Sequence, residues 1–262
     1  MQNRWREMTT SLFSKIIISV TAFASLAMFA WPLLIHSSGV DEARVAQTVF
    51  IVLMPLLLAL VLAEFASGQI DSKQLAILGV LTALNAVIRI LGAGTSGIET
   101  AFFLIIIGAF VFGSGFGFLL GSGSLLVSAL LMGGVGPWLP FQMMAAGLLG
   151  LAAGLLPKPK SRWLERTVLV TFAIFGAYAY GALMTLWNWP YLAGVGTDIS
   201  YLAGAGLLEN LTRFVKYETL TGGLLWDTGR AVTTSVLILL TAPALLATLK
   251  RAAGRAGINR KA

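Results

Sequence analysis

The chain has 262 residues, of which 57% are hydrophobic and only 11% are charged, whereas soluble chains carry about 25% charged residues. One soluble core of this length cannot hide so much apolar surface, so the composition predicts a protein of the lipid bilayer. Cysteine is absent and histidine occurs once, which excludes disulfides and metal sites built from cysteine or histidine clusters. We therefore expect no metal and no cofactor.

Hydrophobic runs predict an all-α polytopic protein with about eight transmembrane helices, because one crossing needs about 20 apolar residues. In chain order the expected helices cover 16–35, 45–63, 74–91, 101–112, 116–132, 141–156, 166–187 and 230–249. No charged residue separates Glu99 from Lys158, and glycine- and proline-rich stretches divide this region into three helices. The run 101–112 is short, so 101–132 is either two crossings or a re-entrant hairpin.

The charge distribution predicts the orientation. If both termini are cytoplasmic, most of the 18 basic residues lie inside and most of the 11 acidic residues lie outside, as the positive-inside rule expects. The net charge of +7 is thus explained by topology and does not indicate nucleic-acid binding. We expect a multi-pass protein of the plasma membrane with both ends in the cytoplasm.

The chain divides into two parts by composition. Residues 1–70 form a leucine-rich pair of helices with few polar groups, interpreted as an accessory hairpin, and 71–262 form a six-helix core richer in glycine and polar residues. The long connection 188–229 is expected outside the cell. Within it, apolar residues at helical spacing over 207–215 predict an amphipathic helix that lies on the membrane or covers the core as a lid.

The helix predicted at 74–91 has two notable faces. One is a stripe of small residues, which packs either inside the chain's own bundle or against a partner subunit. The other face carries Arg89, and an arginine in hydrocarbon costs about 2.5–3.5 kcal/mol on insertion scales. Arg89 therefore faces a cavity or ligand, pairs with Glu99 or Asp227, or extends to the interface. The stripe consists of Ala76, Gly79, Ala83 and Ala86.

Aromatic and polar residues gather at the predicted outer ends of the helices. Tryptophans at a membrane interface are expected as an aromatic belt, and Asp227 also suits a helix cap. Tryptophans interleaved with amide and charged groups also suit a pocket for a bulky, partly apolar ligand. The candidate ligand residues are Asn85, Arg89, Glu99, Trp138, Gln142, Trp187, Asn188, Trp226, Asp227 and Arg230.

Catalytic motifs are missing from the sequence. It has no closely spaced carboxylates within the membrane, no Gly-x-Ser-x-Gly motif and no phosphate-binding loop. The glycines of 113–123 and 147–154 predict tight turns and close helix packing instead. We therefore expect neither an enzyme nor an ATPase.

Residues 71–262 resemble the substrate-binding (S) component of energy-coupling factor (ECF) transporters, a vitamin-uptake branch of the ABC transporters. Three stretches carry the resemblance: 83–89, the glycine-rich 108–113 with Gly117 and Gly121, and 136–143 with 147–154. Residues 225–231 are similar to the start of the last helix in a subgroup associated with cobalamin.

The resemblance implies a six-helix core that binds a vitamin, here a corrinoid such as cobalamin, on its outer side. It also implies a complex with a membrane coupling (T) subunit, contacted by the small-residue stripe, and with two cytoplasmic ATPases. The S component would then reorient in the bilayer to release substrate inward. The alternative from another class is a membrane scaffold protein with a dry, closed bundle.

Overall fold

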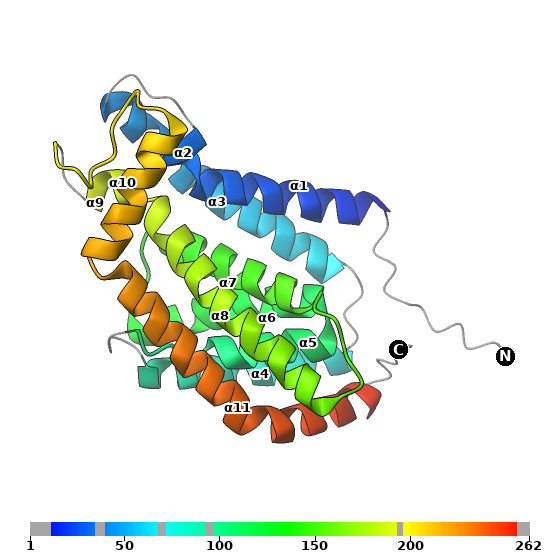
Figure 1. Cartoon of the computed structure of the whole chain (residues 1–262). Coiled ribbons are helices and arrows are strands. Elements are labelled where there is room, and N and C mark those ends of the chain that lie inside the picture. The colour runs from blue at the N-terminus through cyan, green and yellow to red at the C-terminus, as the bar shows by residue number, and fades with distance from the viewer. Residues whose placement is uncertain (1–11, 35–39, 68–71, 93–96, 193–195, 256–262) are drawn as a thin grey trace.

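The computed structural model describes residues 12–34, 40–67, 72–92, 97–192 and 196–255, and within these ranges the chain is helical without strands, as the composition predicts. The sequence ends, on which the prediction of cytoplasmic termini partly rests, lie outside the described residues. The helices are α1 Leu12–Phe29, α2 Trp31–Leu34, α3 Val40–Ser67, α4 Ser72–Gly92, α5 Phe102–Phe112, α6 Ser114–Met132, α7 Leu139–Ala153, α8 Arg162–Leu186, α9 Trp189–Leu192, α10 Leu207–Leu220 and α11 Gly223–Arg255 (Figure 1).

Four described helices, α4, α6, α8 and α11, are long and apolar enough to cross a membrane. Shorter apolar helices cover Ile16–Phe29, Thr48–Ala63, Phe102–Phe112 and Leu139–Ala153. All eight overlap the segments expected from the sequence, but α3, α4 and α11 extend beyond their predicted bounds at both ends, and the predicted helix 16–35 divides at Ala30 into α1 and α2. Hydrophobicity marks only the lipid-embedded part of a helix, whereas backbone hydrogen bonding continues into the polar interface.

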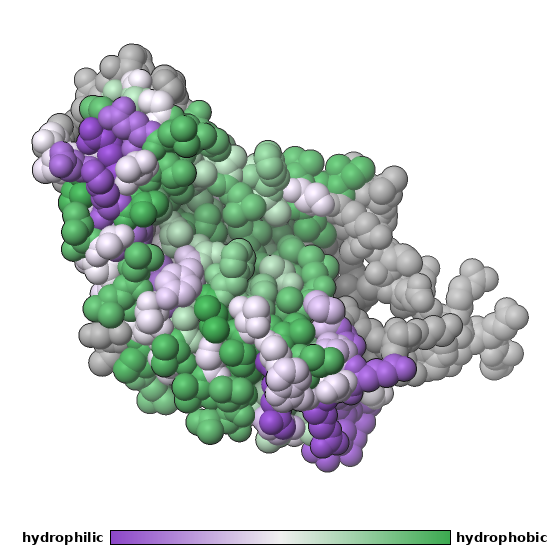
Figure 2. All heavy atoms as spheres, in the orientation of Figure 1, coloured by the Kyte–Doolittle hydropathy of each residue, from purple (hydrophilic) through white to green (hydrophobic). Residues whose placement is uncertain are grey.

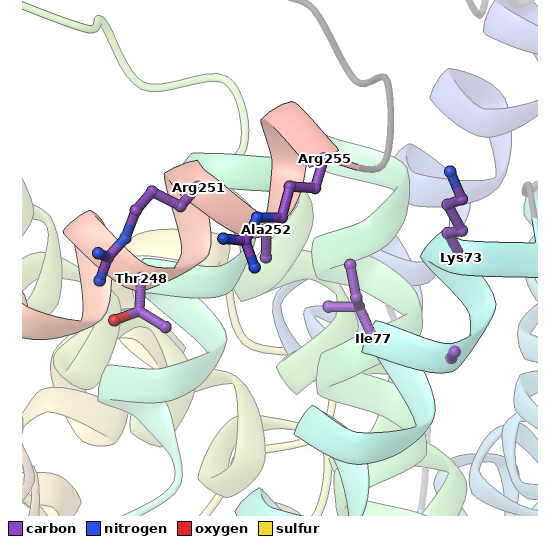
Figure 3. A pocket seen from close by; sticks show the side chains of 7 residues that line it. Lys73, Ile77, Thr248, Arg251, Ala252 and Arg255 are labelled. Atoms are coloured by element: carbon purple, nitrogen blue, oxygen red, sulfur yellow. The ribbon is translucent and has the colours of Figure 1, made fainter.

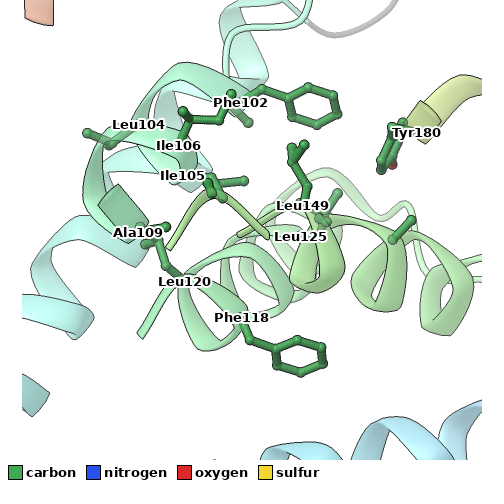
Figure 4. Close-up of a cluster of buried hydrophobic side chains, with 14 of the residues drawn as sticks. Phe102, Leu104, Ile105, Ile106, Ala109, Phe118, Leu120, Leu125, Leu149 and Tyr180 are labelled. Atoms are coloured by element: carbon green, nitrogen blue, oxygen red, sulfur yellow. The ribbon is translucent and has the colours of Figure 1, made fainter. Parts of the chain in front are cut away.

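Helix α5 forms the centre of the six-helix core. Ten of its 11 residues are buried, and it packs against α6, α7, α8 and α11. Figure 4 shows its Phe102, Ile105 and Ala109 among side chains of the neighbouring helices. A helix that is hydrophobic on all sides is most stable where protein surrounds it completely, which explains the position of this short segment.

Helices α6 and α7 approach each other most closely, through glycines. A Cβ atom added to Gly150 would lie 2.0 Å from the carbonyl oxygen of Gly117, and one on Gly121 would lie 2.2 Å from that of Ala146. Only glycine permits this backbone contact, so the glycines expected to serve close packing do so here.

The N-terminal helices share the hydrophobic core of the other six. The ring centroids of Phe29 and Phe141 lie 5.5 Å apart, and the indole Nε1 of Trp31 donates a hydrogen bond to the carbonyl oxygen of Trp187 at 2.8 Å. Helix α3 packs on α7, and α1 contacts α8. The division at residue 70 stays a prediction about function.

Charged side chains gather at the two opposite ends of the bundle, with hydrophobic surface between them (Figure 2). One end, where α8 begins and α11 finishes, carries Lys160, Arg162, Arg251 and Arg255. The other, where α10 lies, α4 finishes and α11 begins, carries both acidic and basic residues, and the charged surface visible there in Figure 2 lies over α10. We call these the basic end and the mixed end.

Candidate functional site

A cavity of about 150 Å³ opens at the mixed end of the bundle. It lies between the last turn of α4, the segment Gly97–Glu99, the end of α6 and the first turns of α11. Four of the ten candidate ligand residues line it together. The complete lining is Arg89, Gly92, Gly97, Ile98, Glu99, Met132, Trp226 and Arg230.

Arg89 brings a positive charge to the cavity from the last turn of α4. Its Nη1 donates a hydrogen bond to the hydroxyl oxygen of Ser128 on α6 at 2.8 Å. Among the described residues no carboxylate lies within salt-bridge distance of Arg89. Of the expected roles for Arg89, the one as a cavity-lining cation agrees best with this geometry.

Arg230 is held in place by a carboxylate and an aromatic ring. Its Nη1 donates to Oδ1 of Asp227, one turn earlier in α11, and its guanidinium lies 5.2 Å from the ring centroid of Tyr180. Asp227 is only 4% exposed. Asp227 therefore lies behind the cavity wall and neutralises Arg230 from inside the protein.

The segment before α5 closes another side of the cavity. Glu99 Oε1 accepts a hydrogen bond from the backbone N–H of Ala101 at 3.0 Å, a favourable place for a carboxylate beside a helix N-terminus. Gly97 has a φ of 79°, and a Cβ there would lie 2.4 Å from the carbonyl oxygen of Trp226. Gly97 thus allows this segment to lie directly on the backbone of α11.

One helical turn deeper, buried polar atoms have no hydrogen-bond partner among the described residues. They are both side-chain atoms of Asn85, four residues before Arg89; Ser124 Oγ, four before Ser128; and Thr234 Oγ1, four after Arg230. Residues four apart lie on the same helix face, so these groups lie one turn beneath Arg89, Ser128 and Arg230, but none of them is among the lining residues of the cavity. Buried polar groups without partners are costly, and a polar ligand or water reaching them would remove that cost.

The remaining candidate ligand residues lie elsewhere. Trp187 is 5% exposed and stacks on Phe141 with a centroid distance of 3.9 Å, so it is part of the core between α7 and α8. Trp138 is 46% exposed, at the start of α7. Gln142 and Asn188 are likewise outside the cavity lining.

The connection between α8 and α11 contains the expected amphipathic helix, α10. Its buried residues are Asn210, Phe214 and Glu218. The side-chain oxygen of Asn210 accepts a hydrogen bond from the backbone N–H of Leu202, and its side-chain nitrogen donates one to the Leu202 carbonyl oxygen, both at 3.0 Å. The leucines, including Leu208 at 77% exposure, face outward. The helix thus packs through a largely polar face and leaves its apolar stripe free for the membrane interface.

Glu218 ties α10 to the region behind the cavity. Its side chain packs against Gly223, where α11 begins. Burial raises the pKa of this carboxyl and the negative charge of Asp227 raises it further, while the Thr185 hydroxyl and Arg230 act in the opposite direction. No sequence pattern singles out Glu218, Tyr180 or Ser128, because an isolated polar residue carries no spacing signal.

The small-residue stripe of α4 lies mostly on the outer surface. Ala76, Gly79 and Ala83 are exposed, and only Ala86 is buried. A Cβ on Gly79 would meet no atom within 4 Å. Three of the four residues therefore lie on the exposed surface of the described chain.

Fold and cavity together describe a helical membrane protein with a small polar chamber at one end, as expected of a transporter subunit that binds a solute. A family model for the substrate-specific component of ECF transporters matches residues 73–248, and the chain belongs to this family. Members are transporter subunits of vitamin and micronutrient uptake, not enzymes. No curated protein and no solved structure matches the chain significantly.

Proposed function

We propose that the chain captures a micronutrient in the cavity lined by Arg89, Glu99, Trp226 and Arg230. The observation that carries this proposal is the guanidinium of Arg89, which lines the cavity with a hydroxyl partner and forms no salt bridge with any described residue. A buried or half-buried cation is costly without a counter-charge, so a ligand carboxylate is the natural partner. Trp226 would cover an apolar part of the same ligand.

The size of the cavity restricts the ligand. Sites for drug-sized molecules have about 300–1,000 Å³, and the cavity has about 150 Å³. A corrinoid, suggested by the resemblance at 225–231, would enter only if Gly97–Glu99 and the start of α11 moved apart. A compact vitamin with a carboxylate fits with less rearrangement, and its other polar groups would meet Glu99 and Arg230 in the cavity lining.

We infer that the mixed end faces outward and the basic end faces the cytoplasm, with eight crossings and both termini inside, because basic residues favour the cytoplasmic side. The exposed stripe of α4 then docks on a coupling subunit, which links the chain to two ATPases. Substrate would pass inward when the complex reorients the chain.

The scaffold alternative predicts a dry bundle, and the charged cavity argues against it.

The test is ligand binding by the purified full chain. Vitamins, corrinoids included, are titrated while tryptophan fluorescence is recorded; ligands that bind should change the emission of Trp226. Arg89→Gln should weaken binding of a carboxylate ligand about 10-fold or more, since a charge-assisted hydrogen bond contributes about 1.5–3 kcal/mol. Arg213→Gln is the control, because Arg213 pairs with Glu209 on α10. Equal affinity of both variants would contradict the proposed site.

A further inference from the structure

A second cavity, larger than the first, lies at the basic end of the bundle. It is an open groove of about 620 Å³ between the first turns of α4 and the last turns of α11. Figure 3 shows Lys73 on one side of this groove and Arg251 and Arg255 on the other, with Ile77 facing α11. The lining residues are Lys73, Ala76, Ile77, Thr248, Arg251, Ala252 and Arg255.

The charge of the groove is entirely positive. No carboxylate is among its lining residues, and none of its three cations forms a salt bridge with a described residue. The neighbouring Lys250, by contrast, is paired with Glu165 of α8. Asp71, just before α4, is outside the described residues. Three like charges without counter-charges favour an anionic occupant.

The walls of the groove are apolar. Ala76, Ile77 and Ala252 are the apolar residues of its lining, and Leu75 and Val80 on α4 are exposed hydrophobic residues. Both helices are long enough to span a membrane, so their basic ends lie near the level of the lipid headgroups. A suitable occupant has an anionic head and an apolar tail.

We propose that this groove binds an anionic phospholipid, with the phosphate between Lys73 and the two arginines and an acyl chain along α4. Basic pockets between transmembrane helices are a known physical basis for such binding. A free phosphate would leave the apolar wall uncovered. An acidic protein segment would satisfy the charges, but it would not explain the continuity with the lipid-facing surface of α4.

The experiment measures the thermal stability of the full chain in neutral detergent with added phosphatidylglycerol, phosphatidylcholine or inorganic phosphate. Phosphatidylglycerol should raise Tm most. Replacing Lys73, Arg251 and Arg255 together by glutamine should weaken its binding about 100-fold, since each cation near the surface contributes about 1 kcal/mol. The control variant replaces Lys158, Lys160 and Arg162, which lie at the same end outside the groove.

Several outcomes would overturn the proposal. One is an equal loss of phosphatidylglycerol binding in both triple variants, which would indicate a general attraction of the anionic lipid to the basic end. Another is an increase in Tm with inorganic phosphate alone that equals the increase with phosphatidylglycerol. A third is unchanged phosphatidylglycerol binding in the groove variant; if that variant also lost co-purification with the coupling subunit, an acidic protein segment would be the occupant. Equal Tm values of the wild type and the groove variant in phosphatidylcholine would show that the variant is folded. A variant with Arg251→Lys and Arg255→Lys, which keeps the positive charges, should bind phosphatidylglycerol like the wild type.

Discussion

At the residue scale, the mixed end shows how a membrane protein accommodates buried charges. Arg230 is bonded by Asp227 and lies 6.0 Å from the ring centroid of Phe102 as well as close to Tyr180. Removing one partner of a buried pair leaves the other charge uncompensated. The pair thus keeps one cavity cation neutralised, while Arg89 has no such partner among the described residues.

We expect Asp227→Asn to lower the free energy of unfolding by about 3–5 kcal/mol, because Arg230 would lose its only described carboxylate partner. Thermal unfolding in detergent measures this. Glu209→Gln is the matched control: it breaks a pair in which Glu209 is 51% exposed and Arg213 24% exposed, and exposed pairs contribute only about 0–1 kcal/mol. Similar losses in the two variants would show that the Asp227 pair is not structurally important.

The second prediction concerns Glu218, whose raised pKa means that the folded protein holds the proton more tightly than the unfolded chain. Stability should therefore fall as pH rises from the ordinary glutamate pKa of 4.5 through the raised value, and stay constant above it. Glu218→Gln should remove this decrease and raise Tm at neutral pH. Thermal unfolding from pH 4 to pH 8 tests this, and a parallel pH profile in both proteins would contradict it.

At the scale of the element, α4 has two different surfaces on opposite faces. One face carries the cavity cation and the buried Asn85, and the other leaves Ala76, Gly79 and Ala83 exposed. Small residues permit close approach of another helix in lipid, where packing drives association. A rotation of this helix would connect the cavity mechanically to whatever packs on the stripe.

We predict that Ala83→Trp weakens co-purification with the coupling subunit and ATPases while ligand affinity stays within about twofold of wild type, because a bulky side chain prevents close helix contact. The control is Ile174→Trp on α8, where the residue is 44% exposed on a helix away from the stripe. Intact assembly with Ala83→Trp would show that the coupling surface lies elsewhere.

At the scale of the whole molecule, the N-terminal helices are joined to the rest by aromatic packing. Trp31 is 1% exposed and lies between Phe50 of α3 and Tyr201, at centroid distances of 5.9 and 6.2 Å. Trp189 also packs on Tyr201 and on Phe214 of α10. The N-terminal helices and the α8–α11 connection therefore support each other at the mixed end.

Trp31→Phe should lower stability by about 0.5–1.5 kcal/mol, because it removes the hydrogen bond to Trp187 and keeps most ring contacts. Ligand affinity should be unchanged, since Trp31 is outside the cavity lining. Trp163→Phe, at a position 71% exposed, serves as the control in the same unfolding assay. A change in ligand affinity would instead assign the N-terminal helices a direct role in binding.

Much of the fold was predictable because a segment that crosses lipid must be apolar and must satisfy its own backbone hydrogen bonds as a helix. Each apolar segment became a helix, and the glycine series marked the close packing of α6 and α7. The grouping of Arg89, Glu99, Trp226 and Arg230 was also predictable, since a charge at membrane depth needs a polar environment. The place of Trp187 in the core was not predictable, because an interface tryptophan and a core tryptophan look alike in sequence.

By itself, the sequence determined that the protein lies in lipid, where the apolar helices lie and that the two ends differ in charge, because length, hydrophobicity and charge act locally. Tertiary structure alone decided the rest. It placed Trp187 against Phe141, buried Asp227 beside Arg230 and buried the polar face of α10. It also formed a basic groove from the first turns of α4 and the last turns of α11, which are far apart in the sequence. These features depend on which helix faces meet, and contacts between distant segments leave no pattern in a single sequence.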